Sequence, residues 1–131
     1  MTQSTEGPTK GPTKEYVVLL PGDEAAWAAA TEDERQATYA QHHEFAQRLE
    51  ERGHRVTGGA ELAHSREAKV LRTTPDGVQT VTEGPYSEAV EQLTGFYLID
   101  TSDLDDLLEV CKILGRGEGV IEVRECKGGT S

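Results

Sequence analysis

The sequence predicts an α+β fold: a ferredoxin-like antiparallel sheet with two helices on one face and an inserted β-hairpin. Two apolar runs, 16–20 and 96–99, have the continuous hydrophobicity of strands that are buried on both faces. An amphipathic helix with a start signal follows each run, and a Pro-Asp-Gly turn at 75–77 joins two short strands between them. The resulting order is β-α-β, hairpin, β-α-β, in which one sheet can bury the apolar sides of both helices.

The first predicted strand, 16–20, ends at Pro21-Gly22 because proline removes a backbone donor. We expect a short separate helical turn at residues 23–30. The second predicted strand, 54–62, alternates only weakly between apolar and polar residues. It contains an irregularity at Gly58-Gly59.

The long helix between these strands begins at a capping box. The side chain of Thr31 can accept from the amide of Glu34, and the Glu34 side chain can reach back to the Thr31 amide. The helix should continue to Gly53, its C-terminal stop. At 100° per residue, one side of the helix carries Thr38, Tyr39, His42, Phe45, Ala46 and Leu49.

The second half of the chain repeats the pattern after the hairpin. Its expected elements are hairpin strands at 69–74 and 78–83, a connection with one helical turn at 87–93, a strand at 94–100, a helix to 114 and a strand at 119–126. Ser102 is the expected N-cap of the helix, whose first turn carries acidic residues where the helix dipole favours negative charge. Its expected apolar stripe contains Leu104, Leu107, Leu108, Cys111 and Leu114.

Length and charge limit the organisation and the partners. The 131 residues fit one domain at 15–126, between a Gly-Pro-Thr-Lys-repeat tail at 1–14 that should be disordered and a flexible tail at 127–131. Thirteen basic and twenty-four acidic residues give 13 − 24 = −11, which disfavours nucleic acids and anionic membranes as partners. No apolar run approaches the ~20 residues of a membrane span. Because the N-terminus also has no signal-peptide pattern, we expect a cytoplasmic protein.

No cofactor or metal is expected. The glycine-rich segment 115–119 follows a helix and precedes a strand, which is the reverse of a dinucleotide-binding context. A metal site from His54, His64 and Glu61 is an alternative, but their spacing matches no metal motif. Cys111 and Cys126 should point away from each other and stay reduced.

Four segments, in this order, resemble the DGPF type of the YCII-related family. They are 22–27 after the first strand, Glu83-Gly84-Pro85-Tyr86 in place of Asp-Gly-Pro-Phe, 91–100 before the second helix, and 120–124 in the last strand. The resemblance covers residues 15 to about 126. It implies a dimeric α/β-barrel, which agrees with a second inference: one face of the sheet has no helix, and a homodimer would cover it.

The resemblance also implies a site. An enzymatic role has been proposed for the family from a His and an Asp that face a cleft; the His matches His42, three residues before Phe45, and no Asp stands near Gly59. Glu61 is the candidate substitute for that Asp. His42 would act as a general acid or base near neutral pH, whereas the alternative is a core or interface histidine with a structural role.

Two aromatic residues are candidate ligand contacts. Trp27 either walls a ligand pocket or fills the dimer seam, and Tyr86 either closes the pocket mouth or packs on the sheet. The expected function is binding of a small organic ligand between the long helix and the sheet or at the dimer interface, with acid/base chemistry at His42. The alternative is a non-catalytic accessory or regulatory module, because relatives of the family often accompany transcriptional sigma factors.

Overall fold

The computed structural model describes residues 11–116 and 119–127, and the other parts of the two expected tails lie outside this range. The elements are β1 (Lys14–Asp23), α1 (Glu24–Ala29), α2 (Glu32–Glu51), β2 (Arg55–Glu61), the 3₁₀ turn η1 (Ser65–Glu67), β3 (Lys69–Thr73), β4 (Gln79–Glu83), β5 (Glu91–Thr101), α3 (Leu104–Cys111) and β6 (Glu122–Glu125). The predicted α+β fold class is confirmed.

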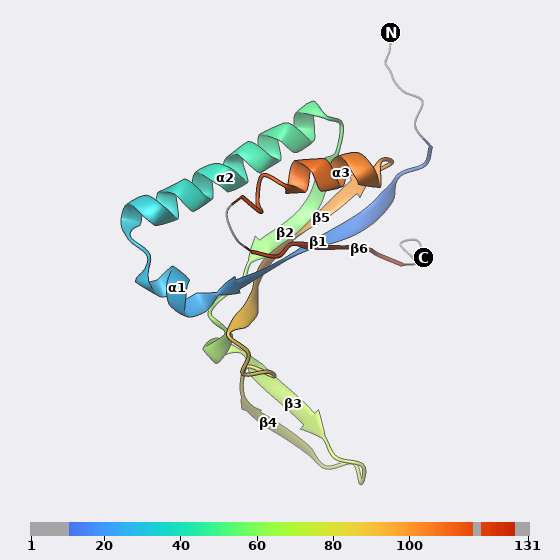
Figure 1. The fold of residues 1–131 in the computed structure, drawn as a ribbon. Helices are drawn as coiled ribbons and strands as arrows, with labels where there is room; N and C mark the ends of the chain where they lie inside the picture. The colour runs from blue at the N-terminus through green and yellow to red at the C-terminus, as the bar shows by residue number, and fades with distance from the viewer. Residues whose placement is uncertain (1–10, 117–118, 128–131) are drawn as a thin grey trace.

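Four strands form an antiparallel sheet in the order β2-β5-β1-β6. Helices α2 and α3 lie on the same face of this sheet (Figure 1). The core is the apolar layer between helices and sheet; its members are Tyr16, Val18, Phe45, Leu49, Ile99, Leu107, Val110, Cys111 and Ile113. Apolar burial of this kind supplies roughly 25 cal/mol for each Å² removed from water.

Strand β1 is longer than the sequence predicts, because it continues through Pro21 to Asp23. The register shifts between Leu20 and Pro21, which marks a bulge. Strand β6 pairs with β1 over residues 16–19, so among the described strands only β5 lies beside β1 at the proline. A proline is tolerated at such a position, where one side of the strand needs no backbone donor.

Helix α2 begins as predicted. Thr31 Oγ1 accepts from the Glu34 amide at 3.1 Å, and Glu34 Oε1 accepts from the Thr31 amide at 2.8 Å. The chain leaves the helix through Gly53, whose φ of 83° is accessible to glycine at little cost. Both ends of the predicted helix are therefore encoded locally.

Helix α3 differs from its prediction at the N-cap. Asp103, not Ser102, caps the helix by accepting from the Asp106 amide at 3.0 Å. Thr101 Oγ1 accepts from the Asp103 amide, so the capping residue is itself held by a side chain. The helix also ends at Cys111, and the expected apolar stripe is partly wrong: Leu104 and Leu108 are exposed, whereas Val110 and Ile113 are buried.

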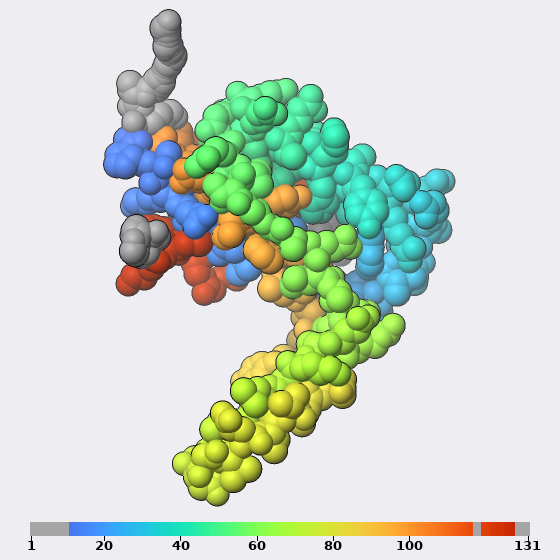
Figure 2. Space-filling model, turned by 180° about the vertical axis from the view of Figure 1, so that it is seen from behind, coloured from blue at the N-terminus to red at the C-terminus, as the bar shows by residue number. Residues whose placement is uncertain are grey.

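Strands β3 and β4 form a separate two-stranded arm that extends away from the body (Figures 1 and 2). Its apolar cross-strand pair, Leu71 and Val81, is 60% and 64% exposed. The helical turn expected at 87–93 is wrong, because the chain is irregular there and β5 already begins at Glu91. The hairpin insertion is confirmed.

The face of the sheet opposite the helices is apolar at its centre. Alternation along β1 and β5 places Val17, Leu19, Phe96 and Leu98 on this face, and the register pairs them as Val17–Leu98 and Leu19–Phe96. All four are half-buried by their neighbours in the same chain. The view from behind shows atoms of β1, β5 and β6 at the surface (Figure 2). We call these four residues the open-face patch.

Candidate functional site

His42 lies on α2, one turn before the fully buried Phe45, at the point where the helix passes over β5. Its Nδ1 is 2.7 Å from the hydroxyl of Tyr97, a residue of β5. The two rings are stacked, with centroids 5.9 Å apart, and Tyr97 also packs on Phe45 at 5.1 Å. His42 is thus fixed by a hydrogen bond to the sheet, and its ring is only half-buried.

Burial controls the charge of this pair. Burial lowers the pKa of His42, and the negative charge of Glu61 partly opposes the shift. Burial also raises the pKa of the Tyr97 phenol. At neutral pH both groups are therefore uncharged, and the imidazole has one donor and one acceptor nitrogen.

Glu61 is the last residue of β2, and β2 lies beside β5. In that register Gly59 is opposite Tyr97, and Glu61 is opposite Gly95. The irregularity expected at Gly58-Gly59 is confirmed, because the register shifts between Val56 and Gly58. Sheet pairing therefore places an exposed carboxylate close enough to His42 to act on its charge.

Trp27 belongs to α1 and lies edge-on to Tyr39, with ring centroids 5.6 Å apart. The Arg35 guanidinium covers its ring at 5.6 Å and donates to the Trp27 carbonyl. Tyr39 precedes His42 by three residues, so the two side chains share one side of α2. Trp27 therefore contacts Tyr39, which lies on the same side of α2 as His42.

Tyr86 does not pack on the sheet, so that alternative is wrong. It follows β4 at the base of the arm and is 79% exposed. The Arg72 guanidinium lies 5.6 Å from its ring centroid. The described contacts of Tyr86 belong to the arm, whereas those of His42 belong to α2 and the sheet.

Comparison with known proteins identifies the family. The model of the YCII-related domain matches residues 15–128. The chain belongs to the YCII-related family. It is also 32% identical over 112 residues to R00369, an uncharacterized protein of Rhizobium meliloti (strain 1021); the aligned region covers 83% of this chain and 89% of that protein.

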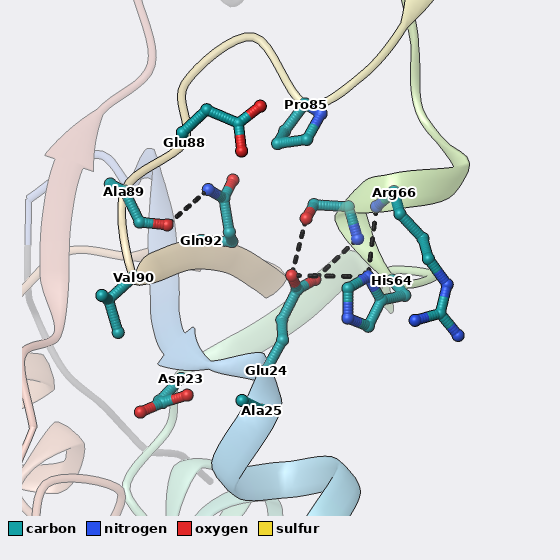
Figure 3. A pocket seen from close by; sticks show the side chains of 11 residues that line it. Asp23, Glu24, Ala25, His64, Arg66, Pro85, Glu88, Ala89, Val90 and Gln92 are labelled. Atoms are coloured by element: carbon teal, nitrogen blue, oxygen red, sulfur yellow. Dashed lines mark hydrogen bonds and ion pairs between the residues drawn. The ribbon is translucent and has the colours of Figure 1, made fainter.

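The YCII domain has a cavity of about 320 Å³ between α1, η1 and the segment that follows β4 (Figure 3). Glu24 on its wall accepts from the Ser65 hydroxyl at 2.6 Å and from the Ser65 amide at 2.7 Å. These bonds lower the pKa of Glu24, and His64 Nδ1 lies 3.6 Å from the same carboxylate. The two hydrogen bonds between Glu24 and Ser65 join α1 to η1, the turn at the base of the arm.

A second cavity of about 270 Å³ lies between α2 and β2 of the YCII domain, next to the buried His54. His54 Nδ1 is 2.7 Å from Thr101 Oγ1, and its Nε2 is 2.7 Å from Asp106 Oδ2. Arg52 also pairs with Asp106. Both nitrogens of His54 are thus engaged in a structural network that joins β2, β5 and α3.

In the part of the chain that the structure describes, no group of three or more His, Cys, Asp or Glu side chains could hold a metal ion. The alternative metal site of His54, His64 and Glu61 is therefore wrong. His54 contacts Asp106, whereas His64 contacts Glu24. Cys111 is buried, Cys126 is half-buried, and both are free. Within residues 11–116 and 119–127, no helix is long and apolar enough to cross a bilayer.

Tyr97 is the site residue that sequence reasoning missed in this YCII domain. It lies in an apolar strand, where the sequence pattern predicts a core residue. It is also 55 positions away from His42 in the sequence. Its alternation with Phe96 and Leu98 shows that it faces the helices. The sequence places His42 on the inner side of α2, but which residue of the sheet it contacts depends on how the helix packs on the strands.

Proposed function

We propose that this YCII domain binds a small organic ligand where α2 meets β5 and β2, and that His42 supplies acid/base chemistry there. The observation that carries the proposal is the 2.7 Å contact between His42 Nδ1 and Tyr97. It orients an imidazole that is half-buried and uncharged at neutral pH, and that still has a second nitrogen. An oriented neutral imidazole is suited to proton exchange or hydrogen bonding with a ligand.

Glu61 would be the carboxylate partner of His42 in this proposal. Its charge acts on His42, which supports the idea that it takes the role of the Asp expected in the family. Trp27 would contribute an apolar wall through its contact with Tyr39. A role of Tyr86 in ligand binding stays a prediction. The side chain of Tyr86 is exposed at the base of the arm, so a ligand could reach its ring.

A homodimer is the second part of the proposal. The open-face patch is an apolar surface at the centre of a four-stranded sheet, and α2 and α3 both lie on the other side of that sheet. A symmetric dimer joins the same surface of two copies, so each patch would meet its equal. The ligand would then lie on the helix side of the sheet in each protomer.

Ligand-induced thermal stabilisation tests the site. A ligand that binds only the native state raises the melting temperature, and it adds about 2.7 kcal/mol at one hundred times its Kd. Compounds that stabilise the wild type should not stabilise His42→Gln. His43→Gln is the matched control, because His43 is the exposed neighbour on the same helix. A ligand that stabilises both variants equally would place the site away from His42.

A non-catalytic accessory or regulatory module is the second candidate function. The observation in its favour is the arm, whose Leu71 and Val81 side chains are exposed and could contact another protein. The same ligand experiment separates the two functions. A ligand that depends on His42 for binding but is recovered unchanged supports a binding module, whereas turnover that is lost in His42→Gln supports an enzyme.

A further inference from the structure

We propose that Tyr97 is a positioning residue: its phenolic O–H donates to His42 Nδ1, which leaves the His42 Nε2–H to bind the carbonyl oxygen of a neutral ligand. This inference rests on the proposed function and names the ligand class for that site. It starts from the 2.7 Å contact between the two side chains.

The direction of this hydrogen bond follows from the groups involved. A phenol has a single O–H donor, and in the described part of the chain its only hydrogen-bond partner is His42. If Nδ1–H were the donor, the half-buried Tyr97 O–H would need a second acceptor, and the structure describes none. Donation from Tyr97 uses the phenol hydrogen and the Nδ1 lone pair in one bond, and it leaves the imidazole N–H for a ligand.

The tautomer of His42 is then determined. A neutral imidazole carries one proton, and Nδ1 uses its lone pair to accept from Tyr97. The proton therefore resides on Nε2, for which no hydrogen-bond partner is described within residues 11–116 and 119–127. The second nitrogen of His42 is therefore a donor, not a bare basic nitrogen.

The sheet holds Tyr97 in the position that this role requires. Val18 of β1 and Gly59 of β2 are its register partners on either side. A Cβ at Gly59 would lie 3.0 Å from the Tyr97 Cα and 2.5 Å from the Phe96 carbonyl oxygen. Phe45 packs on the Tyr97 ring from α2. The phenol is therefore fixed from the two neighbouring strands and from the helix above.

A donor N–H selects a ligand with an acceptor oxygen. Tyr97 contacts His42, the charge of Glu61 acts on the His42 pKa, and the neighbours of His42 on α2 include His43 and Tyr39. An anionic ligand would be repelled by Glu61 and by a chain of net charge −11. A cationic amine has no lone pair to accept from Nε2–H. A neutral carbonyl compound fits the donor without opposing the local charge.

The tautomer can be measured in the free protein by ¹⁵N-detected imidazole NMR. The wild type should show His42 as the Nε2–H tautomer at neutral pH. Tyr97→Phe keeps the ring packing but removes the donor, so the tautomer preference should be lost. The pKa of His42 should also rise, because the lost bond favoured the neutral form.

Tyr39→Phe, the same change on α2, should leave the tautomer and the pKa of His42 unchanged. An Nδ1–H tautomer in the wild type, or an unchanged tautomer in Tyr97→Phe, overturns the assignment.

The ligand class is tested with three probes that share one ring: acetophenone, benzoate and benzylamine. Acetophenone should shift the His42 Nε2–H signal in a saturable way, and Tyr97→Phe should weaken its binding. A stronger response to benzoate or benzylamine, or no response to acetophenone at millimolar concentration, overturns the carbonyl class. The free-protein NMR result is independent of any ligand, so it fails or succeeds separately from the thermal screen that tests the proposed function.

Discussion

His54 Nε2 lies 2.7 Å from Asp106 Oδ2, and this contact joins the residue before β2 to the first turn of α3. His54 is 5% exposed, and its other nitrogen is held by Thr101. A buried polar ring whose partner is removed pays the cost of desolvation without a compensating bond. The contact therefore contributes to stability and leaves no nitrogen of His54 available for chemistry.

Asp106→Asn should lower the free energy of unfolding at neutral pH by about 1–3 kcal/mol. The hydrogen bond from Arg52 is the main cause of the lowered pKa of Asp106, and His54 adds to it. A lowered folded pKa gives stability above the unfolded pKa of about 3.9, and this stability is lost as the pH falls through the folded value. The difference between wild type and variant, measured by urea unfolding, should shrink in acid.

The control for this prediction is Asp105→Asn. Asp105 is the exposed neighbour in the same helical turn, so it tests the general effect of removing a carboxylate near the start of the helix. Equal losses of stability in both variants would show that the helix dipole, and not the contact to His54, is responsible.

Gly59→Ala should destabilise the protein by about 3 kcal/mol, because it combines an unfavourable φ with a backbone clash. Gly59 has φ 144°, and an added Cβ would lie 2.5 Å from the Phe96 carbonyl oxygen. Gly53→Ala is the control: its φ is 83°, but nothing lies within 4 Å of the added atom. That control should cost only about 1 kcal/mol. Denaturant unfolding that gives equal losses would contradict the clash.

The local elements of this fold could be predicted because their signals lie close together in the sequence. The capping box of Thr31 and Glu34 and the turn at 75–77 each need only a few consecutive residues. Local competition already limits such predictions, since Ser102 and Asp103 are both good caps. In the structure Asp103 is the cap, and its own amide donates to Thr101.

The candidate site could be predicted only in part for a different reason. The resemblance to the family and the inward side of the helix both indicate His42, but its partner Tyr97 depends on how the helix lies on the sheet. The role of His54 depends on three elements that meet at Asp106. The hydrophobic pattern of a single helix or strand does not reveal which distant residue it will contact. The register of two paired strands does reveal such contacts, because it fixes which residues lie opposite each other.

Glu24→Gln should loosen the base of the arm. The carboxylate accepts from both the hydroxyl and the amide of Ser65, and an amide side chain cannot make both bonds as strongly. Hydrogen exchange should become faster at the Ser65 amide, and also at Ala68, which donates to the Ser65 carbonyl.

Exchange at the α2 amides is the internal control for Glu24→Gln, because that helix has its own cap and packs on the sheet. Faster exchange over the whole chain would indicate global destabilisation. Unchanged exchange at Ser65 would mean that the Glu24 contact does not hold the arm.

Leu19→Lys should convert the proposed dimer to a monomer. Leu19 lies at the centre of the open-face patch, opposite Phe96 on one side and Glu122 on the other. A lysine there can pair with Glu122 in the monomer, but two copies would bring like charges together across a symmetric interface. Light scattering at micromolar concentration should give twice the chain mass of 14.3 kDa for the wild type and the single mass for the variant.

Leu71→Lys, on the exposed arm, is the control for adding a positive charge and should remain dimeric. A wild-type mass of one chain would refute the dimer, and a dimeric Leu19→Lys would place the interface on another surface.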